Sequence, residues 1–472
     1  MINDELCLLS ACELATVIRD KTVSPVEVTQ AVLNRIERLN PSLNAFCTSM
    51  ADSALEAARA AEADVVRGKQ LGPLHGVPVS IKDNLYVKGV RTTFGSQLLK
   101  DFVPDKDAPI VERLRNAGAV IIGRTNSPEF GWKGVTDNLV FGATRNPWNL
   151  ELTPGGSSGG GSAAVASGLG PIGMGTDGGG SLRIPASFCG LVGHKPSFGR
   201  VPHYPGISVG SLRHVGGMTR TVSDAALLLD VVAGPDERDQ CSLPATDVEY
   251  VTEIDRGIEQ VRAAYSLDLG YGQVDSEVAE SCARGAQRLT EAGAVVEQID
   301  LDWADPYECW KVFFYGGSTA RLRDSFAEQG HLLDPGLRAA VEEGMKLSAA
   351  EFTRALTARN EFWLQVCRVF DTYDLLVTPT LAVPPFRVGQ NNADPFPGQQ
   401  LGDLQWTGFT YPFNLTGQPA TSVPSGWTTS NLPIGMQIIG RRFDDSLVLR
   451  AARAWEQIQP WKHQWPDGLV EG

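Results

Sequence analysis

The spacing of apolar residues predicts helices in the first part of the chain. Apolar residues recur every three or four positions across 28–39, which places them on one face of a helix. Two S-x-x-E patterns, beginning at Ser10 and Ser24, have the spacing of capping boxes, so we expect a helix to begin after each serine. The alanine-rich segment 51–67 is a further helix candidate. Together these segments predict a helical layer over residues 1–70.

After residue 76 the pattern changes to short apolar runs that alternate with helical segments. The strand candidates are 77–81, 119–122, 172–175, 261–267, 294–299, 374–377, 421–423 and 434–439. The helix candidates are 108–117, the segment after Gly160, 223–232, 276–292 and 446–458. Alternation of strands and helices is typical of an α/β fold built around a layered sheet. No internal repeat or clear linker interrupts it, so we expect one large domain over 1–472.

Composition and charge narrow the class of protein. Of 472 residues 42% are hydrophobic, so a large core is expected. The net charge of −14 disfavours binding to a nucleic-acid phosphate backbone. The eight cysteines form no CxxC pair, so the spacings of zinc fingers and haem attachment are absent. The sequence gives no sign of a metal or an organic cofactor, and we expect neither. The acidic N-terminus and the lack of an apolar run of about 18 residues predict a cytoplasmic protein that does not contact a membrane.

The segment 153–183 contains two clusters of glycine and serine. Successive backbone N–H groups in glycine-rich turns form nests that bind anions. Ser181 follows three glycines, so its hydroxyl would lie where such N–H groups stabilise an oxyanion. A flexible linker is the alternative, but apolar segments flank both clusters. We therefore treat Ser181 as a candidate nucleophile.

A serine nucleophile needs a base, and the sequence offers histidines and a lysine. A Ser/His/Asp triad with a residue such as His194, His203 or His214 is one alternative; the last two fall in a glycine-rich region expected to be a loop. Lys82 ends the apolar run 77–81, where burial would lower its pKa enough for a base. An ion pair with Asp83 would instead make Lys82 structural. The spacing leaves these alternatives open.

Several blocks of the chain resemble the amidase signature family. They are, in order, GVPVSIKDN, IIGRTNSPEF, FGATRNPWN, PGGSSGG, GTDGGGSLRIPASFCG and GHKPS. The gaps of 75 residues from Lys82 to Ser157 and 24 from Ser157 to Ser181 also agree with the family. The resemblance implies an α/β fold in which a central mixed, mostly parallel sheet is covered by helices on both faces. It places the signature core at 76–200 and a variable substrate-pocket region at 300–415.

The same resemblance implies a Ser–cisSer–Lys triad. Ser181 would be the nucleophile, Ser157 the bridging serine after a cis peptide bond from Gly156, and Lys82 the base. It implies that the oxyanion hole is formed by the backbone N–H groups of Gly178, Gly179, Gly180 and Ser181. It further implies that the substrate site is lined or supported by Gly131, Ser158, Asp177 and Arg183.

Two positions depart from the usual family pattern. Gly178 stands where threonine or isoleucine is common, which leaves the backbone donors intact but makes the loop softer. His194 stands where leucine is usual. Its role stays open between packing in the core and contact with the substrate.

The resemblance predicts an amidohydrolase that cleaves the C–N bond of a small, partly hydrophobic amide through an acyl-enzyme on Ser181. Aryl or alkyl acylamides and carbamates are the expected substrates. The alternatives are the A subunit of a tRNA-dependent amidotransferase and an esterase with the same triad. Aromatic groups within 303–315 and 396–413 fill the core or line a roomy apolar pocket, and 384–403 is a long loop. The oligomeric state stays open, a homodimer included.

Overall fold

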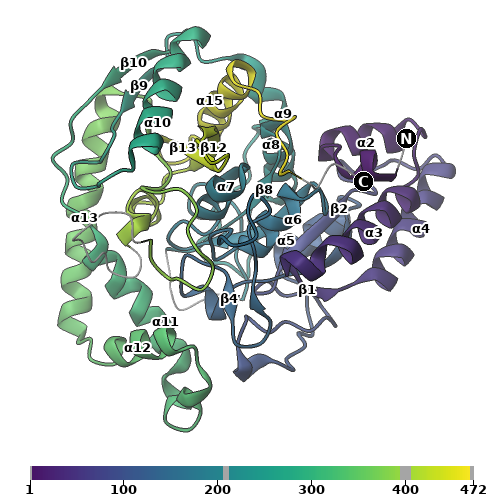
Figure 1. The fold of residues 1–472 in the computed structure, drawn as a ribbon, viewed down its shortest axis with the longest axis horizontal. Coiled ribbons are helices and arrows are strands. Elements are labelled where there is room, and N and C mark those ends of the chain that lie inside the picture. The colour runs from purple at the N-terminus through teal and green to yellow at the C-terminus, as the bar shows by residue number, and fades with distance from the viewer. Residues whose placement is uncertain (1–2, 206–211, 394–404, 468–472) are drawn as a thin grey trace.

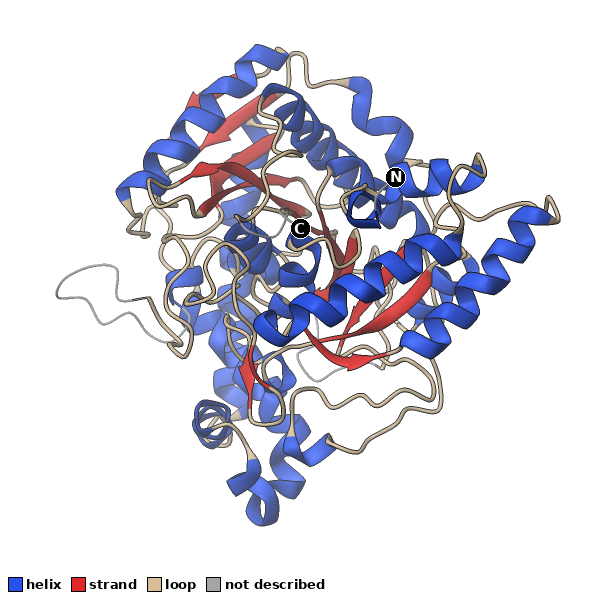
Figure 2. Ribbon diagram, turned by 45° about the vertical axis from the view of Figure 1, so that its right-hand side comes forward, coloured by secondary structure: helices blue, strands red, loops and turns tan. Residues whose placement is uncertain are grey.

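The computed structural model describes residues 3–205, 212–393 and 405–467, which form an α/β structure around one large sheet (Figures 1 and 2). The eleven strands of this sheet lie in the order β1-β3-β2-β6-β8-β7-β12-β13-β11-β9-β10. Their bounds are β1 Phe46–Ser49, β2 Pro78–Lys82, β3 Val120–Thr125, β6 Ile172–Asp177, β7 Val192–Lys195, β8 His214–Thr219, β9 Arg262–Tyr265, β10 Val295–Gln298, β11 Leu375–Pro379, β12 Ala420–Trp427 and β13 Pro433–Gly440. A separate two-stranded sheet consists of β4 Asp137–Asn138 and β5 Gly142–Ala143.

The helices of the described chain both precede the sheet and alternate with its strands. Their bounds are α1 Asn3–Cys7, α2 Ala11–Arg19, α3 Pro25–Leu43, α4 Ala51–Val66, α5 Pro109–Asn116, α6 Gly159–Ala166, α7 Arg183–Cys189, α8 Val222–Val232, α9 Tyr250–Glu253, α10 Ser276–Arg288, α11 Tyr307–Gln329, α12 Pro335–Gly344, α13 Ala349–Thr372, α14 Pro412–Leu415 and α15 Asp445–Ile458. The two predicted capping boxes are present at the starts of α2 and α3. Among the described helices, none combines the length and the apolar character that a membrane span requires.

The expected α/β fold with a mixed sheet is confirmed. Parallel pairing joins β3, β2 and β6 at one side of the sheet and β11, β9 and β10 at the other. The six remaining neighbour pairs described in this eleven-stranded sheet are antiparallel, and four of them cross the centre from β6 to β13. Parallel neighbours therefore dominate within the two side groups, and the centre that joins these groups is antiparallel.

Helices cover both faces of the sheet, as strand side chains on β11 and β13 demonstrate. Side chains of a strand alternate between the two faces. Leu375 and Ile438 belong to a hydrophobic cluster that contains residues of α10 and α15. Leu376 and Ile439 belong to a second cluster, with Phe362 and other residues of α13. Each face of this part of the sheet is thus buried against a different set of helices.

The predicted strands and helices are all present, with ends shifted by a few residues. The stretch 276–292 divides into α10 and a 3-10 turn, Leu289–Ala292. The N-terminal layer is not wholly helical, because β1 pairs with β3. Residues 384–393 contain no helix and no strand beyond an isolated bridge between Leu152 and Arg387, and most of the remaining predicted loop lies outside the described residues.

The prediction of a glycine-rich loop around His214 is wrong, because this residue begins β8 in the centre of the sheet. A Cβ atom on Gly216 would lie 2.5 Å from the carbonyl oxygen of His194, and one on Gly217 would lie 2.3 Å from Leu228 Cδ2. The glycines therefore allow close packing of β8 against its neighbours. Glycine normally weakens a strand, so local sequence preference pointed to a loop.

Candidate active site

Lys82 is the last residue of β2, and its side chain is fully buried. Its amine donates to Ser157 Oγ at 2.7 Å, to Ser158 Oγ at 3.0 Å and to Thr176 Oγ1 at 3.3 Å. Thr176 also accepts a hydrogen bond from Asn84 at 3.0 Å. The amine is thus surrounded by three hydroxyl groups, and these supply both donors and acceptors.

Burial lowers the pKa of Lys82 well below its ordinary value, because a charged ammonium loses its hydration there. The nearby cation of Arg213 lowers this pKa further, while the carboxylate of Asp177 opposes the shift. Arg213 repels a proton on Lys82, so the neutral amine is favoured. A neutral amine has a lone pair and can accept a proton from a hydroxyl group.

The alternative ion pair between Lys82 and Asp83 is absent. Asp83 accepts hydrogen bonds from the backbone N–H of Thr93 at 3.0 Å and from its hydroxyl at 2.5 Å. Its other oxygen lies 3.6 Å from Arg124. Successive residues at the end of a strand point to opposite faces, which separates the two side chains.

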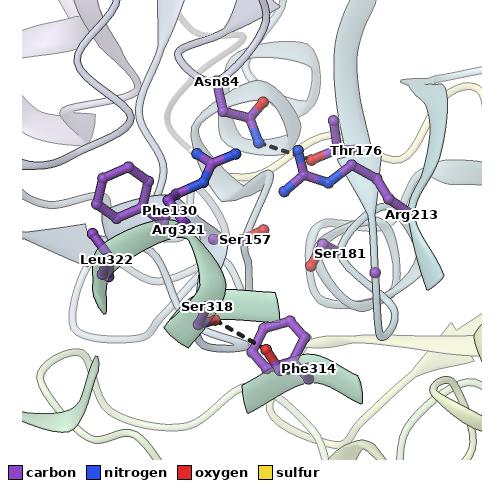
Figure 3. A pocket seen from close by; sticks show the side chains of 12 residues that line it. Asn84, Phe130, Ser157, Thr176, Ser181, Arg213, Phe314, Ser318, Arg321 and Leu322 are labelled. Carbon is purple, nitrogen blue, oxygen red and sulfur yellow. Dashed lines mark hydrogen bonds between the residues drawn. The ribbon is translucent and has the colours of Figure 1, made fainter. Parts of the chain in front are cut away.

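The two glycine- and serine-rich clusters lie side by side. The backbone N–H of Ser158 donates to the carbonyl of Ser181 at 3.2 Å. The peptide bond between Gly156 and Ser157 is cis, as the resemblance implies. Ser157 and Ser181 line the same pocket (Figure 3). The tertiary structure therefore brings Ser157 and Ser181 to one cavity, and the buried amine of Lys82 contacts the hydroxyl of Ser157.

Asp177 shapes the turn that leads to Ser181. Its carboxylate accepts the backbone N–H of Gly180 at 2.7 Å and that of Leu182 at 3.1 Å. The N–H of Gly180 is therefore engaged with Asp177 and does not point freely into the pocket. The carbonyl of Gly178, at the start of the turn, accepts a hydrogen bond from Trp310 Nε1 at 3.0 Å.

A buried ion pair holds Asp177 in place. Arg183 Nε and Nη2 each donate to its carboxylate at 3.0 Å, and both side chains are fully buried. Burial alone would raise the pKa of Asp177, but the Arg183 cation holds it well below the usual range. Asn414 donates to the same carboxylate at 2.8 Å, and Gln437 accepts from Arg183 at 2.7 Å. The donors of Arg183 and the charge of Asp177 are thereby well satisfied.

Three glycines make room for the site. Gly131 has φ of +72°, and a Cβ there would lie 3.2 Å from Ser157 Oγ. A Cβ on Gly179 would lie 2.7 Å from the indole of Trp310, and one on Gly180 would lie 2.3 Å from Thr410 Oγ1. By contrast, a Cβ on Gly178 would have only Phe314 within 4 Å, at 4.0 Å. Position 178 therefore has space for a side chain, as the larger family residues there would suggest.

No histidine belongs to the described lining of this pocket. His194 is buried in β7, where its Nδ1 lies 2.7 Å from Thr421 Oγ1 and its Nε2 lies 3.7 Å from Asp445. These contacts support the packing alternative for His194. His214 Nδ1 lies 2.9 Å from the carbonyl of Leu212. The group that contacts a site serine is thus Lys82 and not a histidine.

The cavity is small and mixed in character, with a volume of about 30 Å³. Its described lining is Asn84, Phe130, Gly131, Ser157, Thr176, Gly178, Ser181, Arg213, Phe314, Ser318, Arg321 and Leu322. Arg213 and Arg321 are not among the site residues predicted from the sequence. Phe314, Ser318 and Arg321 have helical spacing on α11, and that periodicity is the signal that could have grouped them.

Most described rings of the two aromatic groups pack in hydrophobic clusters and do not line the pocket of Ser181. Trp406, Phe409 and Phe413 are buried in the same cluster as Trp303. Trp310 stacks on Phe314 and on Tyr411, with ring centroids 4.5 and 5.5 Å away. Of the aromatic residues singled out in the sequence, Phe314 alone is in the described lining. Phe396 lies outside the described residues. Most of these rings therefore fill the core, which was one of the two alternatives expected from the sequence.

Comparisons with known proteins agree with this site, and the chain belongs to the amidase signature family. The family model described as Amidase matches residues 27–449. The acylamidase of Rhodococcus erythropolis is 39% identical over 483 residues, which cover 100% of both chains. The A subunit of the glutamyl-tRNA(Gln) amidotransferase of Moorella thermoacetica is 38% identical, and the match covers 98% of this chain and 99% of that relative.

Solved structures of the family share the fold. A bacterial aryl acylamidase described as an amidase signature enzyme superposes with a TM-score of 0.89 and 33% identity, covering 96% of each chain. A 6-aminohexanoate cyclic dimer hydrolase superposes with a TM-score of 0.88 and 29% identity, covering 98% of this chain and 99% of its own. The chain is thus an amide-hydrolysing enzyme by family.

Proposed function

We propose that this enzyme hydrolyses a small, partly hydrophobic amide through an acyl-enzyme on Ser181. The observation that carries the proposal is the 2.7 Å contact between Lys82 Nζ and Ser157 Oγ in a pocket that Ser181 also lines. The lowered pKa of Lys82 favours the neutral amine that a base requires. Aryl and alkyl acylamides and carbamates are the substrate classes we expect.

Acylation begins with a proton relay. Neutral Lys82 accepts the proton of the Ser157 hydroxyl, and Ser157 accepts the proton of Ser181. The Ser181 oxygen then forms a bond to the amide carbonyl carbon, and the carbonyl π electrons move to its oxygen. We assign the stabilisation of this oxyanion to the N–H groups of Gly178, Gly179 and Ser181. Gly180 supports them indirectly, since its N–H donates to Asp177.

Collapse of the tetrahedral intermediate breaks the C–N bond. The relay returns a proton to the leaving nitrogen, so a neutral amine departs and Lys82 is neutral again. A water molecule then attacks the ester carbonyl while the same relay accepts its proton. Breakdown of the second intermediate returns the proton to Ser181 and releases the acid. These steps need only the three side chains, backbone donors and one water.

The test is a panel of acyl amides, anilides and carbamates with wild type and the Ser181→Ala, Ser157→Ala and Lys82→Met variants. We expect Ser181→Ala to lower kcat by about 10³-fold or more, because no other group forms the acyl-enzyme. Ser430→Ala removes an exposed hydroxyl in the turn between β12 and β13 and should leave turnover unchanged. Undiminished turnover by Ser181→Ala would refute the proposal.

An amidotransferase A subunit is the second candidate, favoured by the 38% identity to the Moorella thermoacetica relative. Such a role would make glutamine the amide that is cleaved. Purified chain that hydrolyses acylamides but not glutamine would support the amidase. Glutamine cleavage that requires a partner protein would support the amidotransferase.

An esterase is the third candidate. A matched anilide and phenyl ester of the same acid would separate the two activities, because the leaving nitrogen needs the returned proton more than the ester oxygen does. Turnover of the ester alone would support the esterase. The cytoplasmic location expected from the sequence stays a prediction.

A further inference from the structure

Two arginines from distant parts of the chain meet at the pocket. Arg213 immediately precedes β8, and Arg321 lies on α11. Figure 3 shows their guanidinium groups extending toward one another from opposite sides, beside Ser157 and Ser181. The proposed chemistry of the triad uses neither guanidinium.

Neither arginine is paired with a carboxylate of the described chain within 4 Å, although many other arginines are, including Arg183 and Arg338. Arg213 Nη1 lies 3.4 Å from His203 Nε2. The guanidinium of Arg321 lies over the rings of Phe94 and Phe130, 5.3 and 5.2 Å from their centroids. An aromatic ring covers the face of a guanidinium and leaves the N–H groups at its edge to bind an anion.

The electrostatic surroundings of these arginines favour an anion. The described lining of the pocket contains no aspartate or glutamate, although the whole chain carries a net charge of −14. Burial lowers the pKa of Arg213 well below its ordinary value, and the cation of Arg321 lowers it further. Arg213 and Arg321 are both half-buried. Two cations that repel one another in a partly buried site are stabilised when a negative group binds between them.

We propose that the amide substrate carries a carboxylate, which Arg213 and Arg321 bind together. This inference rests on the proposed function and specifies the class of its substrate. A planar carboxylate accepts paired N–H donors from a guanidinium, which fixes its orientation. Phe130, Phe314 and Leu322 line the same cavity and would contact a short hydrocarbon segment between the carboxylate and the scissile amide.

The kinetic test compares neutral and charged amides of equal length. Succinamic acid with butyramide and glutaramic acid with pentanamide place the carboxylate on the acyl side. N-butyrylglycine with N-ethylbutyramide places it on the amine side. We expect kcat/KM for the charged member to exceed that of its neutral partner by about tenfold or more in one of these series, since hydrogen bonds to charged groups are strong.

Substitution of the arginines should remove this preference. Arg321→Gln and Arg213→Gln should each lower the charged-to-neutral ratio of kcat/KM about tenfold, mainly by raising KM for the charged amide. Arg321→Lys keeps the charge and should retain part of the preference. Arg323→Gln is the matched control. Arg323 lies two residues further along α11, is exposed and does not line the pocket of Ser157 and Ser181.

A binding measurement separates this inference from the proposed function. Calorimetry with Ser181→Ala should detect glutarate but not the neutral diamide glutaramide, and Arg321→Gln should weaken glutarate binding about tenfold. If neutral amides are hydrolysed but carboxylates are neither preferred nor bound, the inference is overturned and the amidase function stands. If glutarate binds through the arginines but no amide is cleaved, the amidase function fails and the carboxylate site remains.

Discussion

Lys82 Nζ lies 2.7 Å from Ser157 Oγ, although 75 residues separate them in the chain. The sheet accounts for the position of Lys82 in this contact. Strands β2 and β6 are parallel neighbours in which Ile81 pairs with Met174, so Lys82 and Thr176 lie at the same edge of the sheet. The loop that carries Ser157 closes over this edge and brings its hydroxyl to the amine.

The first prediction concerns the pH dependence of the wild-type enzyme. Lys82 must be neutral to accept a proton, so kcat/KM should rise as pH increases through the pKa of Lys82. Because burial lowers this pKa, the rise should be complete well below the ordinary lysine value of about 10.4. A pH profile of kcat/KM with a neutral amide measures it. A rise centred near the ordinary value would contradict the assignment of a lowered pKa.

The second prediction links Arg213 to the same profile. The cation of Arg213 lowers the pKa of Lys82, so Arg213→Gln should raise it. At a given pH more of the variant would carry a protonated Lys82, and the acidic limb of kcat/KM should move to higher pH. Neutral amides are used here to separate this effect from carboxylate binding. An unchanged limb would show that Arg213 does not act on Lys82.

The third prediction compares two neighbouring glycines. Gly180→Ala places a Cβ 2.3 Å from Thr410 Oγ1 at a φ of +128°, so we expect a loss of about 2–5 kcal/mol in unfolding free energy. In Gly178→Ala the new Cβ has only Phe314 near it, at 4.0 Å, so the unfolding free energy should change by less than about 0.5 kcal/mol. Denaturant unfolding measures both. Equal losses would contradict the packing described for this turn.

The fourth prediction concerns the buried pair of Asp177 and Arg183. Asp177→Asn leaves the buried Arg183 cation without its counterion and should lower the unfolding free energy by about 3–5 kcal/mol at neutral pH. The exposed pair of Arg338 and Glu342 is the control, since Glu342→Gln should cost less than about 1 kcal/mol.

The stability difference between wild type and Asp177→Asn should depend on pH. The pKa of Asp177 is held below its usual value, so its charge stabilises the folded state above an ordinary aspartate pKa of about 3.9. The advantage of wild type should therefore shrink as pH falls below about 4. Denaturant midpoints between pH 7 and pH 3 would reveal this trend, and a constant difference would argue against it.

Periodicity and capping predicted most of the elements around the site. The apolar run before Lys82 forms β2, and the serines at 10 and 24 begin α2 and α3 as expected. The prediction of a loop was wrong at β8. The glycines there allow a neighbouring strand and helix to approach closely, and the local sequence does not reveal these neighbours. The blocks of the signature core likewise indicated Lys82, Ser157 and Ser181 as site residues. The order of residues in the chain does not give the distances between their side chains.

The sequence by itself determined the candidate nucleophile, the candidate bases and the class of fold, because apolar spacing and residue chemistry are local properties of the chain. Only the tertiary structure decided that Lys82 contacts serine hydroxyls and not Asp83, since the strand directs consecutive side chains to opposite faces. It also decided that Arg213 and Arg321 share one cavity. Arg321 comes from α11 and Arg213 from the segment that precedes β8, so their meeting depends on how the fold places these two segments. No pattern within either segment contains that information.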